Sequence, residues 1–103
     1  MTYELIITER AAEQMAQLTE YLLLEIKSRT AAVHLIDGIS DIYDRLLTLP
    51  FQFPLCEDPY LKQKGYRKAK IPDMSYVVIF QIRESTIAVL GIFHELESYG
   101  GKL

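Results

Sequence analysis

The residues best suited to chemistry in this chain are basic side chains that gather in one stretch. They are Lys62, Lys64, Arg67, Lys68 and Lys70, and no acidic residue lies among them. Residues 1–60 carry four basic and ten acidic side chains, whereas residues 61–103 carry seven basic and four acidic ones. The formal net charge of −3 argues against a protein that coats nucleic acid non-specifically. A local basic patch can still steer an anionic partner toward an acidic protein.

Other side chains that could catalyse a reaction or bind a metal stand alone. The sequence has no glycine-rich phosphate loop and no C-x-x-C, H-E-x-x-H or G-x-S-x-G motif. Two isolated histidines, His34 and His94, do not make a metal site, and we expect neither a metal nor another cofactor. Cys56 has no histidine nearby in the sequence, so we interpret it as a buried structural thiol.

Length, cysteine content and hydropathy predict one domain, residues 1–103, in the cytoplasm. A chain of 103 residues suits a single domain. One cysteine excludes an internal disulfide and fits a reducing compartment. The start, Met1-Thr2-Tyr3-Glu4, lacks the basic and apolar regions of a signal peptide. The longest apolar run, from residue 87 to residue 93, is too short to span a membrane.

Two long helices are predicted after a first strand at residues 3–7. Apolar residues recur at helical spacing from Glu9 to about Lys27, and Thr8 offers an N-cap. After a short polar break, Thr30 can cap a second helix. This helix contains Gly38 and ends at Pro50, because proline cannot continue a helix. Helices joined by so short a link should pack as an antiparallel hairpin.

Three strands are predicted after a proline-containing loop at residues 50–64. They cover residues 66–71, 76–82 and 86–93, and the last two are apolar at nearly every position, which is typical of central strands. The polar tail, residues 94–103, is expected to fray. The order β-α-α-β-β-β predicts a small α+β domain, in which the helical hairpin covers one face of an antiparallel sheet and the last three strands form a meander.

Three groups of segments, taken in this order, resemble the RelE/ParE superfamily of type II toxins, the plasmid stabilisation proteins. The groups are Tyr3–Thr8 followed by Ala11-Ala12, then Leu46–Pro50 with Gly65-Tyr66-Arg67-Lys68, and then Tyr76–Phe80 and Val89–His94 with Tyr99 beyond them. Together they span almost the whole chain.

The resemblance implies a cytoplasmic toxin whose growth-inhibiting activity is neutralised by a cognate antitoxin. RelE-like members cleave mRNA on the ribosome, and ParE-like members poison DNA gyrase, so the target is either the ribosome with its mRNA or gyrase. We expect an antitoxin with a disordered acidic or amphipathic tail that folds across the toxin. A homodimer, a hetero-oligomer with the antitoxin, and a degenerate member that binds an antitoxin without being toxic are open alternatives.

Cleaving RNA without a metal needs a base, cations for the phosphate and an acid for the leaving oxygen. Arg67 suits the phosphate because its planar fork matches phosphate oxygens. Lys68 and Lys70 flank Ala69, so they point to one face of a strand, where RelE-like toxins carry two similarly placed lysines. Repulsion between like charges can make one lysine easier to deprotonate, so that it serves as a base.

The resemblance also points to Glu57 as an alternative base and to His94 and Tyr99 as candidate acids. Each has a simpler interpretation: Glu57 is an ordinary loop acid, His94 bonds to the strand end, and Tyr99 docks the tail. The lysines, in turn, are solvated or contact the antitoxin.

Two departures from the RNA-cleaving pattern weigh toward a ParE-like gyrase inhibitor. RNA-cleaving relatives usually carry an arginine directly after the tyrosine at the position of Tyr76, and here Val77 stands there. They also have a basic tail, whereas this chain has Glu95 and Glu97, which would repel RNA. A complete RelE-type site is therefore not visible in the sequence, and a gyrase inhibitor needs a binding surface instead of a catalytic set.

Overall fold

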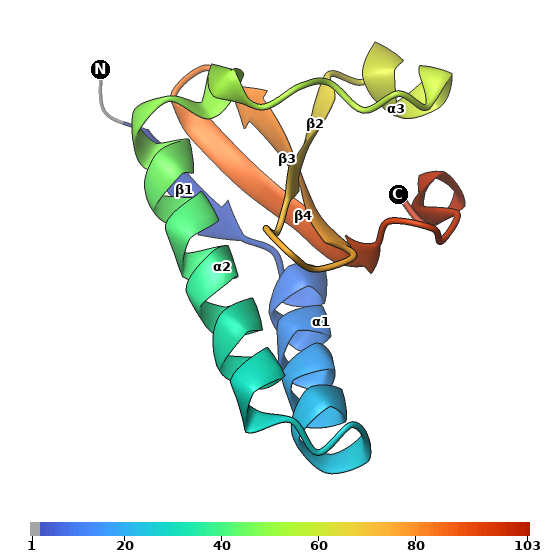
Figure 1. The fold of residues 1–103 in the computed structure, drawn as a ribbon. Helices are drawn as coiled ribbons and strands as arrows, with labels where there is room; N and C mark the ends of the chain where they lie inside the picture. Colours follow the sequence, from blue (N-terminus) through green and yellow to red (C-terminus); the bar gives the residue numbers. More distant parts are fainter. Residues whose placement is uncertain (1–2) are drawn as a thin grey trace.

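Two helices lie across one face of a four-stranded sheet, and the turn that joins them projects beyond it (Figure 1). The computed structural model describes residues 3–103, so Met1 and Thr2, which entered the argument against a signal peptide, lie outside the described residues. The predicted α+β order is confirmed. The elements are β1 Glu4–Ile7, α1 Glu9–Glu20, a π-helical turn Tyr21–Glu25, α2 Arg29–Thr48, a 3₁₀ turn Pro50–Gln52, α3 Pro59–Gln63, β2 Tyr66–Lys70, β3 Tyr76–Arg83, β4 Thr86–His94 and a 3₁₀ turn Tyr99–Gly101.

The sheet has the strand order β1-β4-β3-β2 and is mixed. The predicted meander is confirmed, because β2 pairs antiparallel with β3 and β3 with β4. Both apolar strands, β3 and β4, are central as expected. The expectation of a wholly antiparallel sheet was wrong for β1, which runs parallel to β4 with Leu5 opposite Ile87. Parallel neighbours need a long crossover connection, and the helices and strands between β1 and β4 supply one.

Both long helices begin at hydroxyl caps. Thr8 caps α1 as predicted, since its Oγ1 accepts a hydrogen bond from the backbone N–H of Ala11 at 3.3 Å. The cap of α2 is Ser28 and not the predicted Thr30, because Ser28 has extended backbone angles and its Oγ accepts from Ala31 N at 3.1 Å. The first helix does not stay α-helical to Lys27, because its last residues form the π-helical turn.

The helical hairpin buries its predicted apolar stripe against the sheet. Leu35, Ile39 and Leu46 of α2 and Val78 and Phe80 of β3 are fully buried in one cluster. Burying a side chain of this size contributes about 1.5–3 kcal/mol. The contact between hairpin and sheet is therefore the main source of stability.

A second, smaller apolar cluster covers the opposite face of the sheet. It consists of Cys56, Leu61, Val77, Ile79 and Phe93, with Tyr66, Leu90, Tyr99 and Leu103 packed against it. Two segments cover this face, and both were predicted to be irregular. The prediction of a loop was wrong for residues 59–63, which form the helix α3 capped by Asp58. The prediction of a fraying tail was also wrong, because the Tyr99 ring stacks on Phe93 with centroids 5.4 Å apart. Covering is favourable because it removes the apolar side chains on this face of the sheet from water.

The close approach of Ile71 explains the glycine inside α2. A Cβ atom at Gly38 would lie 2.6 Å from Cγ2 of Ile71, which is fully buried. The β-branched side chain of isoleucine has little rotational freedom with which to give way. Gly38 therefore lets α2 lie directly on the chain that follows β2.

We predict that Gly38→Ala destabilises the fold by about 1–3 kcal/mol, the usual cost of overpacking. Helix propensity alone would predict a gain of about 1 kcal/mol from the same change. Urea unfolding followed by circular dichroism measures the difference, and Ser40→Ala in the same helix is the control, because Ser40 is exposed. A Gly38→Ala protein as stable as the wild type would contradict this packing.

Candidate functional site

The basic strand β2 sends its side chains to both faces of the sheet. Lys68 lies opposite Ile79 and Lys70 opposite Val77, and both of these partners belong to the cluster on the face away from the helices. Arg67 lies opposite Phe80, which belongs to the cluster under the helices. Residues paired across two strands point to the same face. The lysines therefore share a face, as predicted, and Arg67 points away from them.

Each of the two lysines has a carboxylate partner within the chain. The Nζ atom of Lys68 lies 3.5 Å from Oε1 of Glu57, and that of Lys70 lies 3.8 Å from Oε2 of Glu95. The Glu57 side chain is 89% exposed, and exposed ion pairs of this kind are weak. The pairing nevertheless reduces the positive charge that either lysine presents to an anion.

These side chains line a cleft on the face away from the helices. The cleft has a volume of about 350 Å³ and includes Glu57, Lys68 and Tyr99, and an adjoining hollow of about 220 Å³ includes Lys70. Four carboxylates line the two hollows beside the two lysines, namely those of Glu57, Asp58, Glu95 and Glu97. A bound phosphate would therefore lie among more negative than positive groups.

Tyr99 forms one wall of this cleft. Burial raises the pKa of its hydroxyl, and the charges of Cys56, Glu57, Asp58 and Glu95 raise it further. A raised pKa makes the hydroxyl a weaker proton donor at neutral pH. The stacking of its ring on Phe93 agrees with the simpler interpretation, in which Tyr99 docks the tail.

Arg67 ties the loop before α3 to the sheet. Its Nη1 donates a hydrogen bond to the carbonyl of Phe53 at 2.6 Å, and its guanidinium lies over the ring of Phe51, 5.0 Å from the centroid. Lys68 N donates to Pro54 O at 3.0 Å in the same region. The guanidinium that was predicted to bind phosphate is thus engaged in holding the loop.

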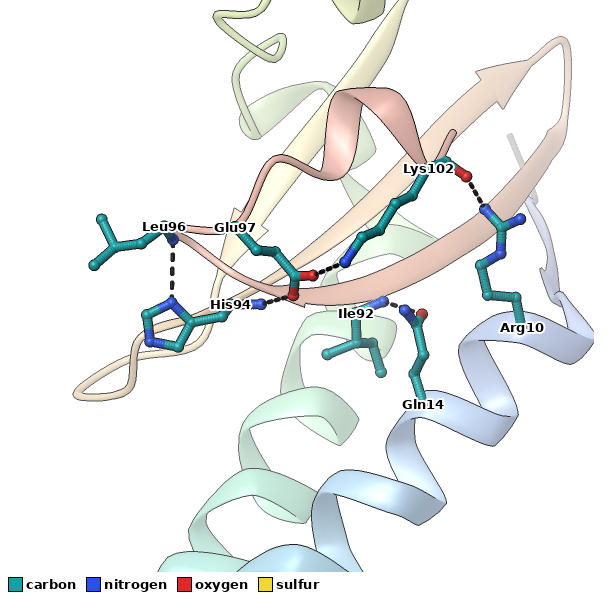
Figure 2. A network of polar contacts seen from close by, with 7 residues as sticks. All are labelled: Arg10, Gln14, Ile92, His94, Leu96, Glu97 and Lys102. Carbon is teal, nitrogen blue, oxygen red and sulfur yellow. Dashed lines mark hydrogen bonds and ion pairs between the residues drawn. The ribbon is translucent and has the colours of Figure 1, made fainter.

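His94 points to the helical side of the sheet. Ile92, two residues earlier on the same strand, belongs to the cluster under the helices, and the His94 ring packs edge-on against Tyr76 at 5.6 Å. Its Nδ1 accepts a hydrogen bond from Leu96 N at 3.1 Å (Figure 2). The imidazole therefore closes the turn after β4 and does not join the lysines on the other face.

Glu97, predicted only as a charge that would repel RNA, organises the tail. Its carboxylate accepts hydrogen bonds from His94 N at 2.7 Å and from Lys102 Nζ at 2.5 Å (Figure 2). The bond from Lys102 is the main cause of a lowered Glu97 pKa, and the bond from the His94 backbone adds to it. No pattern in the sequence indicated this role.

Two other residues with clear structural roles were missed. Asp58 accepts from Leu61 N at 3.1 Å and caps α3, and the Asp58-Pro59 pair was a recognisable helix-start signal. Gln14 on α1 accepts a hydrogen bond from Ile92 N at 2.8 Å, beyond the point where β1 stops pairing with β4. That contact joins residues 78 positions apart, so a local pattern could not predict it.

Cys56 and His34, which stand alone in the sequence, have structural roles and no catalytic partners among the described contacts. Cys56 is 1% exposed, and burial raises the pKa of its thiol. The Nε2 atom of His34 lies 2.7 Å from the carbonyl of Pro72. Within residues 3–103 no three side chains of the kinds that bind metals come together. Nor does any helix there have the length and apolar character to cross a membrane.

An apolar groove lies on the helical hairpin. Its volume is about 630 Å³, and it is lined by Ala12, Met15, Ala16, Thr19, Glu20, Leu23, Leu24 and Ile36. Leu24 is 61% exposed and Ile36 40% exposed. Contiguous exposed apolar side chains of this kind mark interaction surfaces.

We predict that Arg67 and Lys70 differ sharply in their effect on stability. Arg67→Ala leaves the Phe53 carbonyl without its charged donor and should lower the free energy of unfolding by about 1–3 kcal/mol. Lys70→Ala removes only a long, exposed ion pair and should change it by less than about 0.5 kcal/mol. Urea unfolding of both variants tests this, and equal stabilities would show that Arg67 has no structural role.

Comparison with known proteins gives the family. The model of the family described as ParE toxin of type II toxin-antitoxin system, parDE, matches residues 5–99. No curated protein matches the chain. Among solved structures, a chain of the "Chromosomal ParDE TA system from P. aeruginosa" is similar in fold, with a TM-score of 0.71 and 18% identity over 90% of this chain and 96% of that one. The family match covers nearly all of the sequence, and the chain therefore belongs to the ParE toxin family, the toxins of type II toxin–antitoxin systems.

Proposed function

We propose that this toxin inhibits growth by binding DNA gyrase and that it does not cleave mRNA. The observation that carries the proposal is the dispersal of the candidate catalytic groups. Lys68 and Lys70 each lie beside a carboxylate, Arg67 bonds to the carbonyl of Phe53, and His94 points to the other face of the sheet.

Metal-free RNA cleavage depends on groups that converge on one phosphate. A base, an acid and unpaired cations must all reach the reacting atoms. In this chain the cleft with the two lysines contains four carboxylates and a tyrosine with a raised pKa. Nearby carboxylates repel a phosphate backbone, whose binding relies on cationic groups. The position at which RNA-cleaving relatives carry an arginine is Val77, and it is buried.

The family match supports gyrase as the target, because resemblance to ParE-like members implies that enzyme. Inhibition by binding requires a complementary surface and no catalytic constellation. The second candidate is ribosome-dependent mRNA cleavage by Glu57, Lys68, Lys70 and Tyr99. It is favoured by one observation, namely that these four residues line the cleft and the adjoining hollow.

We predict that the double variant Lys68→Ala/Lys70→Ala stays toxic and inhibits gyrase supercoiling within about threefold of the wild type, since exposed pairs contribute less than about 1 kcal/mol. Lys62→Ala/Arg83→Ala is the matched control, because it also removes two positive charges and both of its residues are exposed. Supercoiling by purified gyrase and mRNA cleavage on programmed ribosomes are measured side by side. Loss of toxicity in the folded double variant, with mRNA cleavage by the wild type alone, would establish the nuclease instead. A folded wild type without either activity would indicate a degenerate member.

An antitoxin partner follows from membership of the family. We place the neutralising segment of that antitoxin, as an amphipathic helix, in the groove along α1 and the π-helical turn, beside Ile36 of α2. The groove is lined mainly by apolar side chains and is open to solvent, as helix-in-groove recognition requires. The exposed apolar side chains at its edge would become buried in such a complex.

We predict that Leu24→Glu weakens binding of the cognate antitoxin at least about tenfold, because a carboxylate would be buried in an apolar contact. Leu96→Glu is the matched control, since Leu96 is 86% exposed and lies far from the groove in the sequence. Calorimetry with purified antitoxin gives both affinities, and supercoiling inhibition shows whether each variant is still active. Unchanged affinity of Leu24→Glu would place the antitoxin elsewhere.

A further inference from the structure

We infer that the C-terminal segment Leu96–Leu103 is a strap that opens as a unit from the sheet, and that Arg10 on α1 is its latch. The strap lies over the face away from the helices. It governs access to the apolar cluster of Cys56, Leu61, Val77, Ile79 and Phe93. The inference stands on contacts within the chain and does not depend on which target the toxin has.

Apart from its bonds to His94 at the end of β4 and the bond from Arg10, the backbone of the strap is bonded, among the described residues, only within the strap. Directly before the strap, Glu95 N donates to the carbonyl of Ser75, the residue that precedes β3, at 2.8 Å. Beyond it, the backbone bonds found are local: Glu97 N to His94 O, Tyr99 N to Glu97 O, and Lys102 N and Leu103 N to Tyr99 O. The strap can therefore move as one body about the turn after β4 without breaking a ladder of sheet hydrogen bonds.

The strap is fastened at one end by an exposed hydrogen bond. The Nη1 atom of Arg10 donates to the carbonyl of Lys102 at 2.6 Å, and both residues are exposed (Figure 2). The ion pair between Lys102 and Glu97 lies within the strap, and the Glu97 carboxylate also accepts from His94 N at the end of β4, where the strap turns away from the sheet. Water competes with an exposed bond, and the latch is therefore weak compared with the buried core.

Beneath the strap lies an apolar face that only short segments cover. Tyr99 and Leu103 pack on the cluster from above, beside the five-residue helix α3. Cys56 is 1% and Phe93 2% exposed while the strap is in place. This cluster has five buried residues and the one under the hairpin has fourteen, so local opening should occur here well below the free energy of global unfolding.

Cys56 provides a direct measurement of this opening, because it is the only cysteine and the strap helps to bury it. We propose to follow its reaction with an aromatic disulfide reagent in the folded protein, at several low urea concentrations. The expected result is labelling faster than global unfolding permits, with a urea dependence smaller than that of global unfolding, since opening exposes little surface.

The latch is tested by Arg10→Ala, which should speed labelling about three- to tenfold, the change expected from losing one ordinary hydrogen bond at an exposed position. Arg83→Ala is the matched control, because it removes an exposed arginine on the far hairpin turn. Arg10→Lys keeps a donor and should restore part of the protection. Tyr99→Ala, which removes the ring that stacks on Phe93, should give the fastest labelling.

Either of two labelling results would overturn the inference. One is labelling of the wild type with the rate and urea dependence of global unfolding. The other is an unchanged rate in Arg10→Ala. If Tyr99→Ala does not fold, the Arg10 variants still decide the question, because Arg10 is exposed and its substitution leaves the apolar clusters intact. Amide hydrogen exchange at Lys102 and Leu103 that is no faster than exchange at Ile92 would also contradict an opening strap.

Discussion

The structure depends on the need to cover two central strands that are apolar on both faces. Val78 and Phe80 of β3 point to one side, and Val77 and Ile79 point to the other. Leaving either set in water would forfeit about 25 cal/mol for each square ångström of apolar surface. The long helical hairpin covers the first side, and α3 with the C-terminal segment covers the second. The arrangement of the functional surfaces follows from this division.

The covering of the second face decides what the basic strand can do. Lys68 and Lys70 emerge on that face, where the covering segments bring Glu57, Asp58, Glu95 and Glu97 around them. The positive charge of the lysines is thus matched by carboxylates that lie in or next to the segments covering this face. Arg67, on the other side of β2, holds the loop that carries Phe51 and Phe53. The basic residues of β2, which resemble a phosphate-binding site in the sequence, therefore serve mainly to hold neighbouring segments in place.

The covering of the first face leaves a different kind of surface. The far end of the hairpin projects beyond the sheet (Figure 1). An apolar groove runs along α1 and the π-helical turn, with Ile36 of α2 at its side. Stability of the core does not account for that exposure, because the stripe that packs on the sheet is already buried. A toxin held by an antitoxin needs a surface of this kind, one that binds a partner strongly and can be vacated.

The sequence by itself determined the two long helices and the four strands, because their signals are local. Apolar spacing identified both helices, the apolar runs of residues 76–82 and 86–93 identified the central strands, and alternation put Lys68 and Lys70 on one face. Only the tertiary structure decided the parallel pairing of β1, the docking of the tail and the partners of the candidate residues. Strand order, register and loop path decide which residues meet. They pair Glu57 with Lys68 and Lys70 with Glu95, and they put His94 on the face of the sheet opposite to the lysines. Those are set by contacts between residues distant in the sequence, on which a local pattern carries no information.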